Sequence, residues 1–286
     1  MGYGKDGELV PKVYVIVLNW NGWSDTAACL SSLQQLSYEN FRVVVVDNDS
    51  TDDSCARLRA AFPWANVVEA GKNLGFAGGC NFGMRPALVD GAEFVWLLNN
   101  DTTVAPDALT ALVDKALSAP DIGAVGSAIY CAHDPEQLES WGGGRINFFL
   151  GRSRPLLMPV ADERVEFITG ASLLLSRKVI ETVGQLDEGF FMYWEDADYC
   201  LRLRDAGWRL AVAGQSKVWH KGSASIGKRS VRMDTCFNAS AVRFFDRHAR
   251  VPIVPLGVGI GLRLVKRIVA RDWERVRAVW AGANVL

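Results

Sequence analysis

Short apolar runs, separated by segments with a helical pattern, organise the chain. The first runs are rich in Val, Ile and Leu and occupy residues 13–18, 41–46, 66–70 and 94–98. Runs of this length and β-branched content predict strands covered on both faces of a parallel sheet. Apolar residues recur at helical spacing in residues 25–36, 51–61 and 106–117. The alternation predicts an α/β fold with a mostly parallel central sheet flanked by helices.

The second half of the chain continues this pattern less regularly. Strands are expected at residues 123–129, 172–176 and 217–220, and a helix at 195–206 that ends at Gly207. Residues 131–168 contain a glycine-rich loop at 141–144 and are compatible with either a hairpin or a flexible insertion. Residues 221–232 are rich in Ser, Gly and basic side chains and predict a mobile loop.

The last segment is basic and predicts an amphipathic helical extension. Its apolar residues step by three or four positions, at Leu262, Val265, Val269, Trp273, Val276 and Trp280. The whole chain has a net charge of -1, whereas residues 243–286 carry nine Lys or Arg against three acids, a local balance of +6. Such a helix fits peripheral docking on an anionic membrane surface. The alternative is a helix packed on the rest of the chain or in a homodimer interface.

Composition narrows the class of protein. A chain of 286 residues with 49% hydrophobic and 22% charged residues can bury a large core, which argues against disorder. The six cysteines form no C-x-x-C pair, which favours free thiols in a reducing compartment over disulfides or a zinc site. The first twelve residues lack the apolar core of a signal peptide, and the longest apolar run, 251–262, is about half the roughly 20 residues that span a bilayer. We therefore expect a cytoplasmic protein.

Polar residues follow three of the predicted strands directly. They are Asn19, Asp47 and the run Asn99, Asn100, Asp101. The carboxyl ends of parallel strands meet at one edge of the sheet, where open α/β sheets bind ligands. Asp101 could there hold a divalent cation that bridges a nucleotide diphosphate, because hard cations prefer oxygen ligands. The alternative is a polar turn after each strand.

Residues 71–83 are unusually rich in glycine. Glycines at this density before a helical segment allow the backbone to approach a ligand closely and leave amide N–H groups free for an anion.

A cluster of acids follows an aromatic segment. Glu195, Asp196 and Asp198 come after Phe190, Phe191, Met192, Tyr193 and Trp194. Acids at the edge of an apolar pocket are desolvated, which raises their pKa and suits a general base. The alternative is charge complementarity in the first turn of a helix. His220, alone at the end of a predicted strand, is by itself more typical of a structural histidine.

Several rival enzyme classes lack their signatures. A dinucleotide-binding fold places its glycine-rich turn before the acidic strand end, whereas here Asp47 precedes Gly75. The sequence contains neither G-x-x-x-x-G-K-[ST] nor G-x-S-x-G, so it carries no P-loop and no serine-hydrolase elbow. Nucleic acid is not an expected partner.

Six blocks together resemble one known family. They read V-L-N-W-N, V-V-V-D-N-D-S-T-D, N-L-G-F-A-G-G-C-N-F-G, L-L-N-N-D-T, T-G-A-S-L-L-L-S-R and M-Y-W-E-D-A-D-Y-C-L-R. In this order they resemble the family-2 glycosyltransferases with the GT-A fold, in particular the bacterial rhamnosyltransferase-like and galactofuranosyltransferase-like members. The resemblance covers residues 13–220 and, more weakly, 243–248. It implies a catalytic domain at 1–232, with a nucleotide-binding half at 12–130 and an acceptor half at 131–232, followed by the tail at 233–286.

The resemblance also implies a role for individual residues. The donor set is Asn19, Asp47, Asn73, Gly75, Phe76, Asn81, Asn99, Asn100, Gly170 and Ala171. Asp101 matches the metal-binding acid of the family's D-x-D motif, and His220 matches a histidine that completes the metal shell in some relatives. Asp196 matches the catalytic base, preceded by Glu195, with Trp194 and Asp198 on the acceptor side. Asn99 replaces the first acid of D-x-D, so a cation would depend more on the donor diphosphate and on His220.

The implied activity is transfer of a sugar with inversion. A Mg²⁺ or Mn²⁺ ion would stabilise the leaving diphosphate, and Asp196 would take the proton from the acceptor hydroxyl. The first candidate donor is dTDP-rhamnose, with a glycan or polyprenyl-diphosphate-linked acceptor in cell-surface polysaccharide synthesis. The alternatives are a UDP-sugar-dependent galactofuranosyl or hexosyl transferase and a non-catalytic nucleotide-sugar-binding partner protein.

Overall fold

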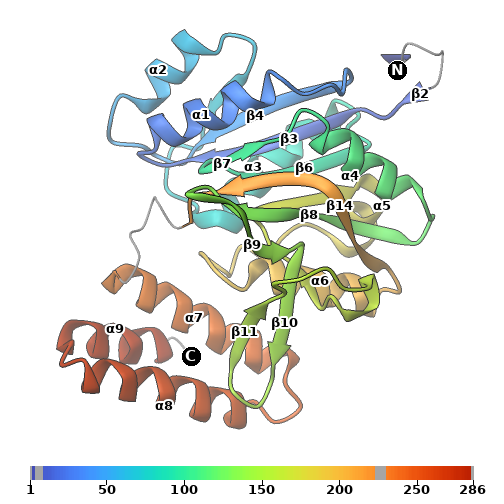
Figure 1. The fold of residues 1–286 in the computed structure, drawn as a ribbon. Coiled ribbons are helices and arrows are strands. Elements are labelled where there is room, and N and C mark those ends of the chain that lie inside the picture. Colours follow the sequence, from blue (N-terminus) through green and yellow to red (C-terminus); the bar gives the residue numbers. More distant parts are fainter. Residues whose placement is uncertain (1, 4–8, 223–229, 285–286) are drawn as a thin grey trace.

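The central feature of the protein, in a computed structural model, is one large twisted sheet with helices on both faces (Figure 1). The structure describes residues 2–3, 9–222 and 230–284. The strands of the sheet run in the order β5-β4-β3-β6-β13-β8-β14-β7, and β9 pairs with β8. Their bounds are β3 Val13–Asn19, β4 Phe41–Asp47, β5 Asn66–Glu69, β6 Phe94–Asn99, β7 Thr102–Val104, β8 Ile122–Cys131, β9 Asp134–Trp141, β13 Ser172–Ser176 and β14 Arg209–His220.

The first half of the sheet is parallel, as the sequence predicts. In β3, Val13, Val15 and Val17 point to one core, and Tyr14 and Ile16 point to the other. Both faces are buried, which explains why these strands read as continuous apolar runs. The parallel register places Asn19 beside Asp47 and Leu18 beside Asn99, so the polar strand ends meet at one edge.

The helices cover the two faces unequally. Their bounds are α1 Trp23–Leu33, α2 Ser54–Ala61, α3 Gly75–Val89, α4 Ala108–Leu117, α5 Arg177–Val183, α6 Glu195–Asp205, α7 Val231–His248, α8 Ile253–Val269 and α9 Trp273–Ala283. Helices α1, α2 and α4 bury their apolar sides on one face, and α3, α5, α6 and α7 on the other. Residues of the latter core, among them Phe167, Trp194 and Ala197, line the cavity described below.

The second half of the sheet is mixed. Strand β13 is antiparallel to both β6 and β8, whereas β14 runs parallel to β8 and antiparallel to β7. The short strand expected at 217–220 is only the end of β14, whose earlier part is also apolar and buried. The sheet is thus parallel from β5 to β6, whereas β13 and β7 run antiparallel to their neighbours.

Residues 131–168 form strands, which settles the alternative left open by the sequence. After β9, strands β10 Gly143–Asn147 and β11 Arg152–Pro155 pair as an antiparallel hairpin, and β12 Phe167–Ile168 also pairs with β10. A short 3-10 helix, Asp162–Arg164, lies between β11 and β12. The remaining small sheet pairs β1 Gly2–Tyr3 with β2 Leu9–Val10. The hairpin projects from the main sheet toward the C-terminal helices (Figure 1).

The apolar stripe predicted at residues 262–280 falls on two helices, α8 and α9, and not on one. Arg271 has a left-handed backbone with φ of 55°, and the Asp272 side chain accepts a hydrogen bond from Arg275 N to begin α9. Helix α7 buries Phe244 and Phe245 in the core of the catalytic side, so it is part of the domain rather than a separate tail. Residues 223–229, within the loop expected at 221–232, lie outside the described residues.

Two further expectations concern cysteines and membrane spans. Cys29, Cys55, Cys80, Cys200 and Cys236 have free thiols, in agreement with their spacing in the sequence. Within the described ranges, no helix has both the length and the apolar character needed to cross a membrane.

Candidate active site

One cavity of about 430 Å³ opens at the carboxyl ends of the strands. It is bounded on one side by the residues that follow β4 and β6, and on the other by the start of α6 and the segment before it. Eleven of the residues assigned from the sequence line it: Asn73, Phe76, Asn99, Asn100, Asp101, Gly170, Ala171, Trp194, Glu195, Asp196 and His220. Segments far apart in the sequence therefore converge on one site.

The first side of the cavity, which we name the strand-end wall, consists of Asn48, Asn73, Asn100 and Asp101. Asn48 Nδ2 donates to Gly75 O at 3.0 Å and to Asn73 Oδ1 at 3.2 Å. Asn48 Oδ1 accepts from Leu74 N at 2.9 Å. These bonds fix the Asn48 amide, because each of its polar atoms has a partner.

Behind this wall lies a buried chain of hydrogen bonds. Asn100 Nδ2 donates to Thr26 Oγ1 at 2.9 Å, and Thr26 Oγ1 donates to Asn19 Oδ1 at 2.7 Å. Asn19 Nδ2 then donates to Asp47 Oδ2 at 2.8 Å. Asn19 and Asp47 thus lie behind the cavity surface and position Asn100.

Asp101 lies beside His220, which supports the predicted pairing of these residues. His220 Nε2 is 3.2 Å from Asp101 Oδ1, and His220 Nδ1 is 3.3 Å from both carboxylate oxygens of Glu139. Burial alone would lower the pKa of His220, but the two carboxylates outweigh it and raise the pKa to about 9. The Glu139 carboxylate at Nδ1 resembles the carboxylates that orient metal-binding histidines, in which the other ring nitrogen binds the metal.

The second side of the cavity, which we name the helix wall, consists of Gly170, Trp194, Glu195 and Asp196. Asp196 Oδ2 accepts a hydrogen bond from Gly170 N at 2.9 Å, and Oδ1 accepts from Ala197 N at 2.7 Å. Burial raises the pKa of Asp196 although both N–H groups act in the opposite direction. Burial, followed by the neighbouring Asp196, raises the pKa of Glu195 well above its usual range. Glu195 shows the larger rise in pKa, so a proton shared by the pair is held more tightly on Glu195.

The backbone that leads into this wall is strained. Tyr193 and Trp194 both have φ of 69°, a left-handed conformation that bulky residues adopt at a cost of about 1–3 kcal/mol. The Trp194 ring packs on Phe244 and Phe245 of α7, with centroids 4.6 and 5.0 Å away. Its Nε1 is buried without a hydrogen-bond partner among the described residues, as is Glu195 Oε2. Trp194 and Glu195 both line the cavity, although these two atoms are themselves buried.

The comparison with known families decides the class of protein. The family model described as "Glycosyl transferase family 2" matches residues 14–184. The chain belongs to this family. It is a nucleotide-sugar glycosyltransferase with the GT-A fold.

Individual relatives have low sequence identity to this chain. The N-acetylglucosaminyl-diphospho-decaprenol L-rhamnosyltransferase of Mycobacterium tuberculosis is 28% identical over 247 residues, which cover 77% of this chain and 80% of that protein. The dTDP-rhamnosyl transferase RfbF of Shigella flexneri is 23% identical over 239 residues, 77% of this chain and 71% of that protein. The mannosyltransferase PcManGT of Pyrobaculum calidifontis, solved with GDP-Man and Mn²⁺, superposes with a TM-score of 0.62 at 19% identity, over 96% of this chain and 86% of that one.

The glycine-rich segment differs from the expectation of a ligand-binding loop. All of its glycines except Gly71 lie within α3, where a Cβ at Gly79 would meet Leu18 and one at Gly83 would lie 2.8 Å from Ile16 Cγ2. They allow α3 of the glycosyltransferase to pack closely on the sheet. Gly75, with φ of 70°, makes room for Phe191 O, which accepts a bond from Phe76 N at 2.7 Å. Gly75 thus positions the loop before the helix wall and does not itself line the cavity.

Asn81, predicted to bind the donor, and Asp198, predicted on the acceptor side, do not line the cavity and make contacts within the protein. Asn81, on α3, exchanges hydrogen bonds with the backbone of Leu186 and lies outside the cavity. Asp198 is fully buried and accepts bonds from Arg202, Arg247 and His248. These partners lower the pKa of Asp198 against the effect of burial. The Asp198 carboxylate therefore ties α6 to α7 and is not placed to contact an acceptor.

Sequence reasoning missed cavity residues that become neighbours only in the fold. Asn48 directly follows Asp47 and shared its strand-end signal. Glu139 lies on β9, in the segment that the pattern left open. Arg232, at the start of α7, places its guanidinium 4.4 Å from the Trp20 ring at the cavity. No local sequence signal identified Glu139 or Arg232.

Proposed function

We propose that this glycosyltransferase is metal-dependent and inverting, and that it transfers rhamnose from dTDP-rhamnose to a lipid-linked or glycan acceptor. The observation that carries the proposal is Asp196, a carboxylate with raised pKa held by Gly170 N–H in the same cavity as Asp101. The names of the mycobacterial and Shigella relatives support rhamnose as the sugar to test first. The intact Glu195, Asp196 and Asp101 favour an enzyme over a non-catalytic sugar-binding partner.

The residues at the strand ends suit a cation that is completed by the donor. Within the described part of the chain, no group of three or more His, Cys, Asp or Glu side chains is placed to hold a metal by itself. Asp101 and His220 would supply two ligands, because His220 Nε2 lies 3.2 Å from Asp101 Oδ1 and a cation would replace the proton that His220 holds there at neutral pH. A bound Mg²⁺ or Mn²⁺ would supply Lewis-acid stabilisation of the leaving diphosphate.

The protein's own groups then account for the transfer. Asp196 accepts the proton of the acceptor hydroxyl while that oxygen forms a bond to the anomeric carbon. The bond from this carbon to the nucleotide diphosphate breaks, and the configuration inverts because one displacement occurs. The hydrogen bonds from Gly170 N and Ala197 N hold the Asp196 carboxylate in place for this step.

A donor screen tests the proposal. We expect the full chain with Mn²⁺ or Mg²⁺ to hydrolyse dTDP-rhamnose faster than UDP-galactofuranose or UDP-hexoses, and expect EDTA to abolish the reaction. Nucleotide release measures the rate, and Asp196→Asn provides the inactive control. Preference for a UDP-sugar would reject rhamnose, and turnover unaffected by EDTA would reject the metal. Absence of turnover with every donor, despite tight nucleotide-sugar binding, would favour the non-catalytic partner protein.

A further inference from the structure

The outward side of α8 is apolar, whereas its inward side carries charged residues. Val254, Leu262, Val265, Ile268 and Val269 are exposed, and we name this set the α8 apolar face. On the opposite side, Arg263 Nε donates to Asn238 Oδ1 at 2.7 Å, and Arg267 Nη2 donates to Asp234 Oδ1 at 2.7 Å. The usual surface helix buries its apolar side and exposes its charges. The inverted arrangement indicates an apolar partner outside the chain.

The β10–β11 hairpin extends this apolar surface. Phe149 at its tip is 66% exposed, and Phe148 stacks on Phe244 of α7 with ring centroids 6.2 Å apart. The Gly151 carbonyl accepts a bond from Arg263 Nη1 at 3.0 Å, which fastens the hairpin to α8. Figure 1 shows the hairpin tip reaching the α8 helix. Two segments far apart in sequence thus present apolar side chains at the same end of the molecule.

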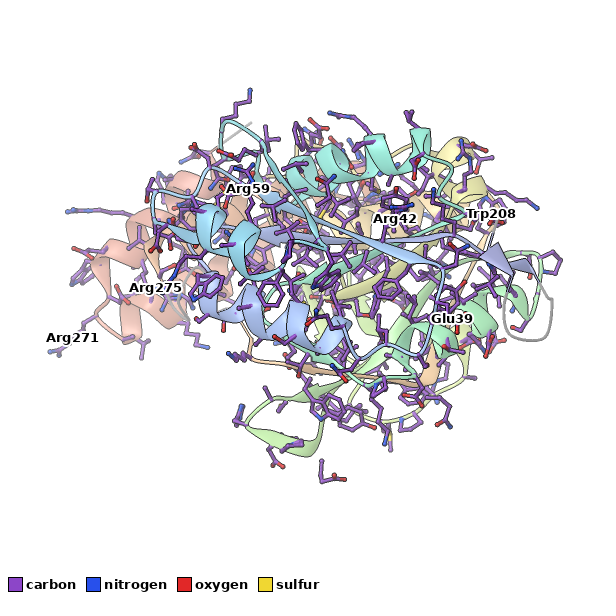
Figure 2. The ribbon with its side chains drawn as sticks, turned by 90° about the horizontal axis from the view of Figure 1, so that it is seen from above. Glu39, Arg42, Arg59, Trp208, Arg271 and Arg275 are labelled. Atoms are coloured by element: carbon purple, nitrogen blue, oxygen red, sulfur yellow. The ribbon has the colours of Figure 1, made fainter. Side chains whose placement is uncertain are left out.

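Exposed tryptophans and cations flank the α8 apolar face along the chain. Trp273, Arg277 and Trp280 lie on one side of α9 at spacings of four and three, and all are exposed. Lys266 and Arg271 are also exposed, and Figure 2 shows Arg271 at the outer edge of the C-terminal helices. Trp residues favour the boundary between lipid and water, and basic residues favour anionic lipid head groups.

We propose that the α8 apolar face, the Phe149 tip and the flanking tryptophans and cations form a docking surface for an anionic lipid bilayer. The surface lies on the membrane without crossing it, with the apolar side chains between the acyl chains and the cations among the head groups. A second copy of the chain fits less well. A two-fold interface would pair the surface with itself and bring the cations of both copies together. Anionic lipid complements the apolar and basic residues at once.

Docking would deepen the proposed function by bringing the cavity to a lipid-linked acceptor, and to that extent it rests on that function. The binding step itself needs no sugar donor. Vesicle binding without donor therefore tests the surface separately, since its failure would leave glycosyl transfer untouched and a failed donor screen would leave docking untouched.

The experiment is flotation of the full chain with vesicles of phosphatidylcholine containing phosphatidylglycerol, compared with phosphatidylcholine alone. We expect binding to the anionic vesicles that weakens with salt, and little binding to the neutral ones. The double variant Val265→Asp/Ile268→Asp should weaken binding at least about tenfold, because it removes two apolar contacts with lipid. Arg271→Glu and Arg277→Glu should each weaken it at least about fivefold.

Matched controls separate docking from general effects. Leu117→Asp changes an exposed apolar residue on α4, and Lys178→Glu changes an exposed cation on α5. Neither should alter flotation, and circular dichroism should show the same helix content in every variant. Phe149→Ser provides a second apolar variant outside the helices, so misfolding of α8 cannot account for a loss in both.

Three outcomes would overturn the proposal. The first is a wild-type chain that does not float with anionic vesicles. The second is an equal loss of binding in the control variants. The third is a wild-type dimer in sedimentation velocity that Val265→Asp/Ile268→Asp converts to a monomer, which would assign the surface to a second copy of the chain.

Discussion

The strand-end wall and the helix wall differ in how fully their polar groups are hydrogen-bonded. In the strand-end wall, Asn48 and Asn100 bond to neighbours within the protein before any ligand arrives. In the helix wall, Trp194 Nε1 and Glu195 Oε2 are buried and lack hydrogen-bond partners among the residues that the structure describes. Each such atom costs about 1–3 kcal/mol. These two atoms therefore add unfavourable energy to the helix wall, although both carboxylate oxygens of Asp196 accept hydrogen bonds there.

The difference follows from how each wall is built. The strand-end wall is formed where parallel strands stop, and register alone brings its residues together. The helix wall depends on left-handed backbone at Tyr193 and Trp194 and on support from Phe244 and Phe245 of α7. Strain and raised pKa values gather where proton transfer is proposed. The fixed wall suits donor binding, and the strained wall suits the reacting hydroxyl.

The largest expected effect is a loss of turnover when the helix wall is changed. Asp196→Asn should lower kcat by about 10²–10⁴, because the amide cannot accept the hydroxyl proton. Steady-state release of nucleotide measures it. Asp205→Asn, an exposed acid at the end of the same helix, should leave kcat unchanged. A kcat near that of the wild type would remove Asp196 as the base.

The next effect concerns Asp101. Asp101→Asn should weaken Mn²⁺-dependent donor binding by more than about 100-fold, since loss of a ligand should exceed the effect usual for an outer partner. Calorimetry with and without Mn²⁺ measures it, and the exposed Asp107→Asn serves as the control. Donor affinity that is unchanged when the metal is present would reject Asp101 as a ligand.

Glu139 should have a smaller effect through His220. Glu139→Gln removes the charge that faces His220 Nδ1 and should weaken Mn²⁺ affinity by about 10–100-fold. Glu136→Gln lies on the same strand, is exposed and should have no effect. Mn²⁺ titration by electron paramagnetic resonance compares the two variants. Equal affinities would show that Glu139 does not support the metal site.

The smallest effect is on stability and tests whether Glu195 is protonated. Burial raises the pKa of Glu195 in the folded chain, so the folded state holds this proton more tightly than the unfolded state. Its favourable contribution is fully present below the unfolded pKa of about 4.3 and is lost as pH rises through the folded pKa. Glu195→Gln should remove this loss. The Tm difference, variant minus wild type, should increase from pH 4 upward; a difference independent of pH would contradict it.

The sequence predicts the strand-end wall far better than the helix wall. Asn19, Asp47 and Asp101 follow apolar runs directly, so period and register place them from local pattern alone. A glycine-rich segment such as 75–83 has the same composition whether it binds an anion or lets a helix pack closely. The contacts with Leu18 and Ile16 show that here the glycines let α3 pack closely on the sheet. Local composition cannot make that distinction.

Non-local contacts explain the remaining differences. Asp198 has the sequence context of a site acid, but its carboxylate contacts Arg247 and His248, about fifty residues later in the chain. Glu139 reaches His220 only because β9 pairs with β8 beside β14. The break at Arg271 requires a left-handed residue that the apolar spacing does not reveal. In each case, the deciding partner lies on another element of the fold.

The central claim is that the strand-end wall binds the donor and the helix wall transfers the proton. Donor calorimetry on Asp196→Asn and Asp101→Asn with Mn²⁺ present tests it most directly. The account predicts that Asp196→Asn, although inactive, binds dTDP-rhamnose as the wild type does, whereas Asp101→Asn loses the metal-dependent part of the affinity. A large loss of donor affinity in Asp196→Asn, or none in Asp101→Asn, would contradict it.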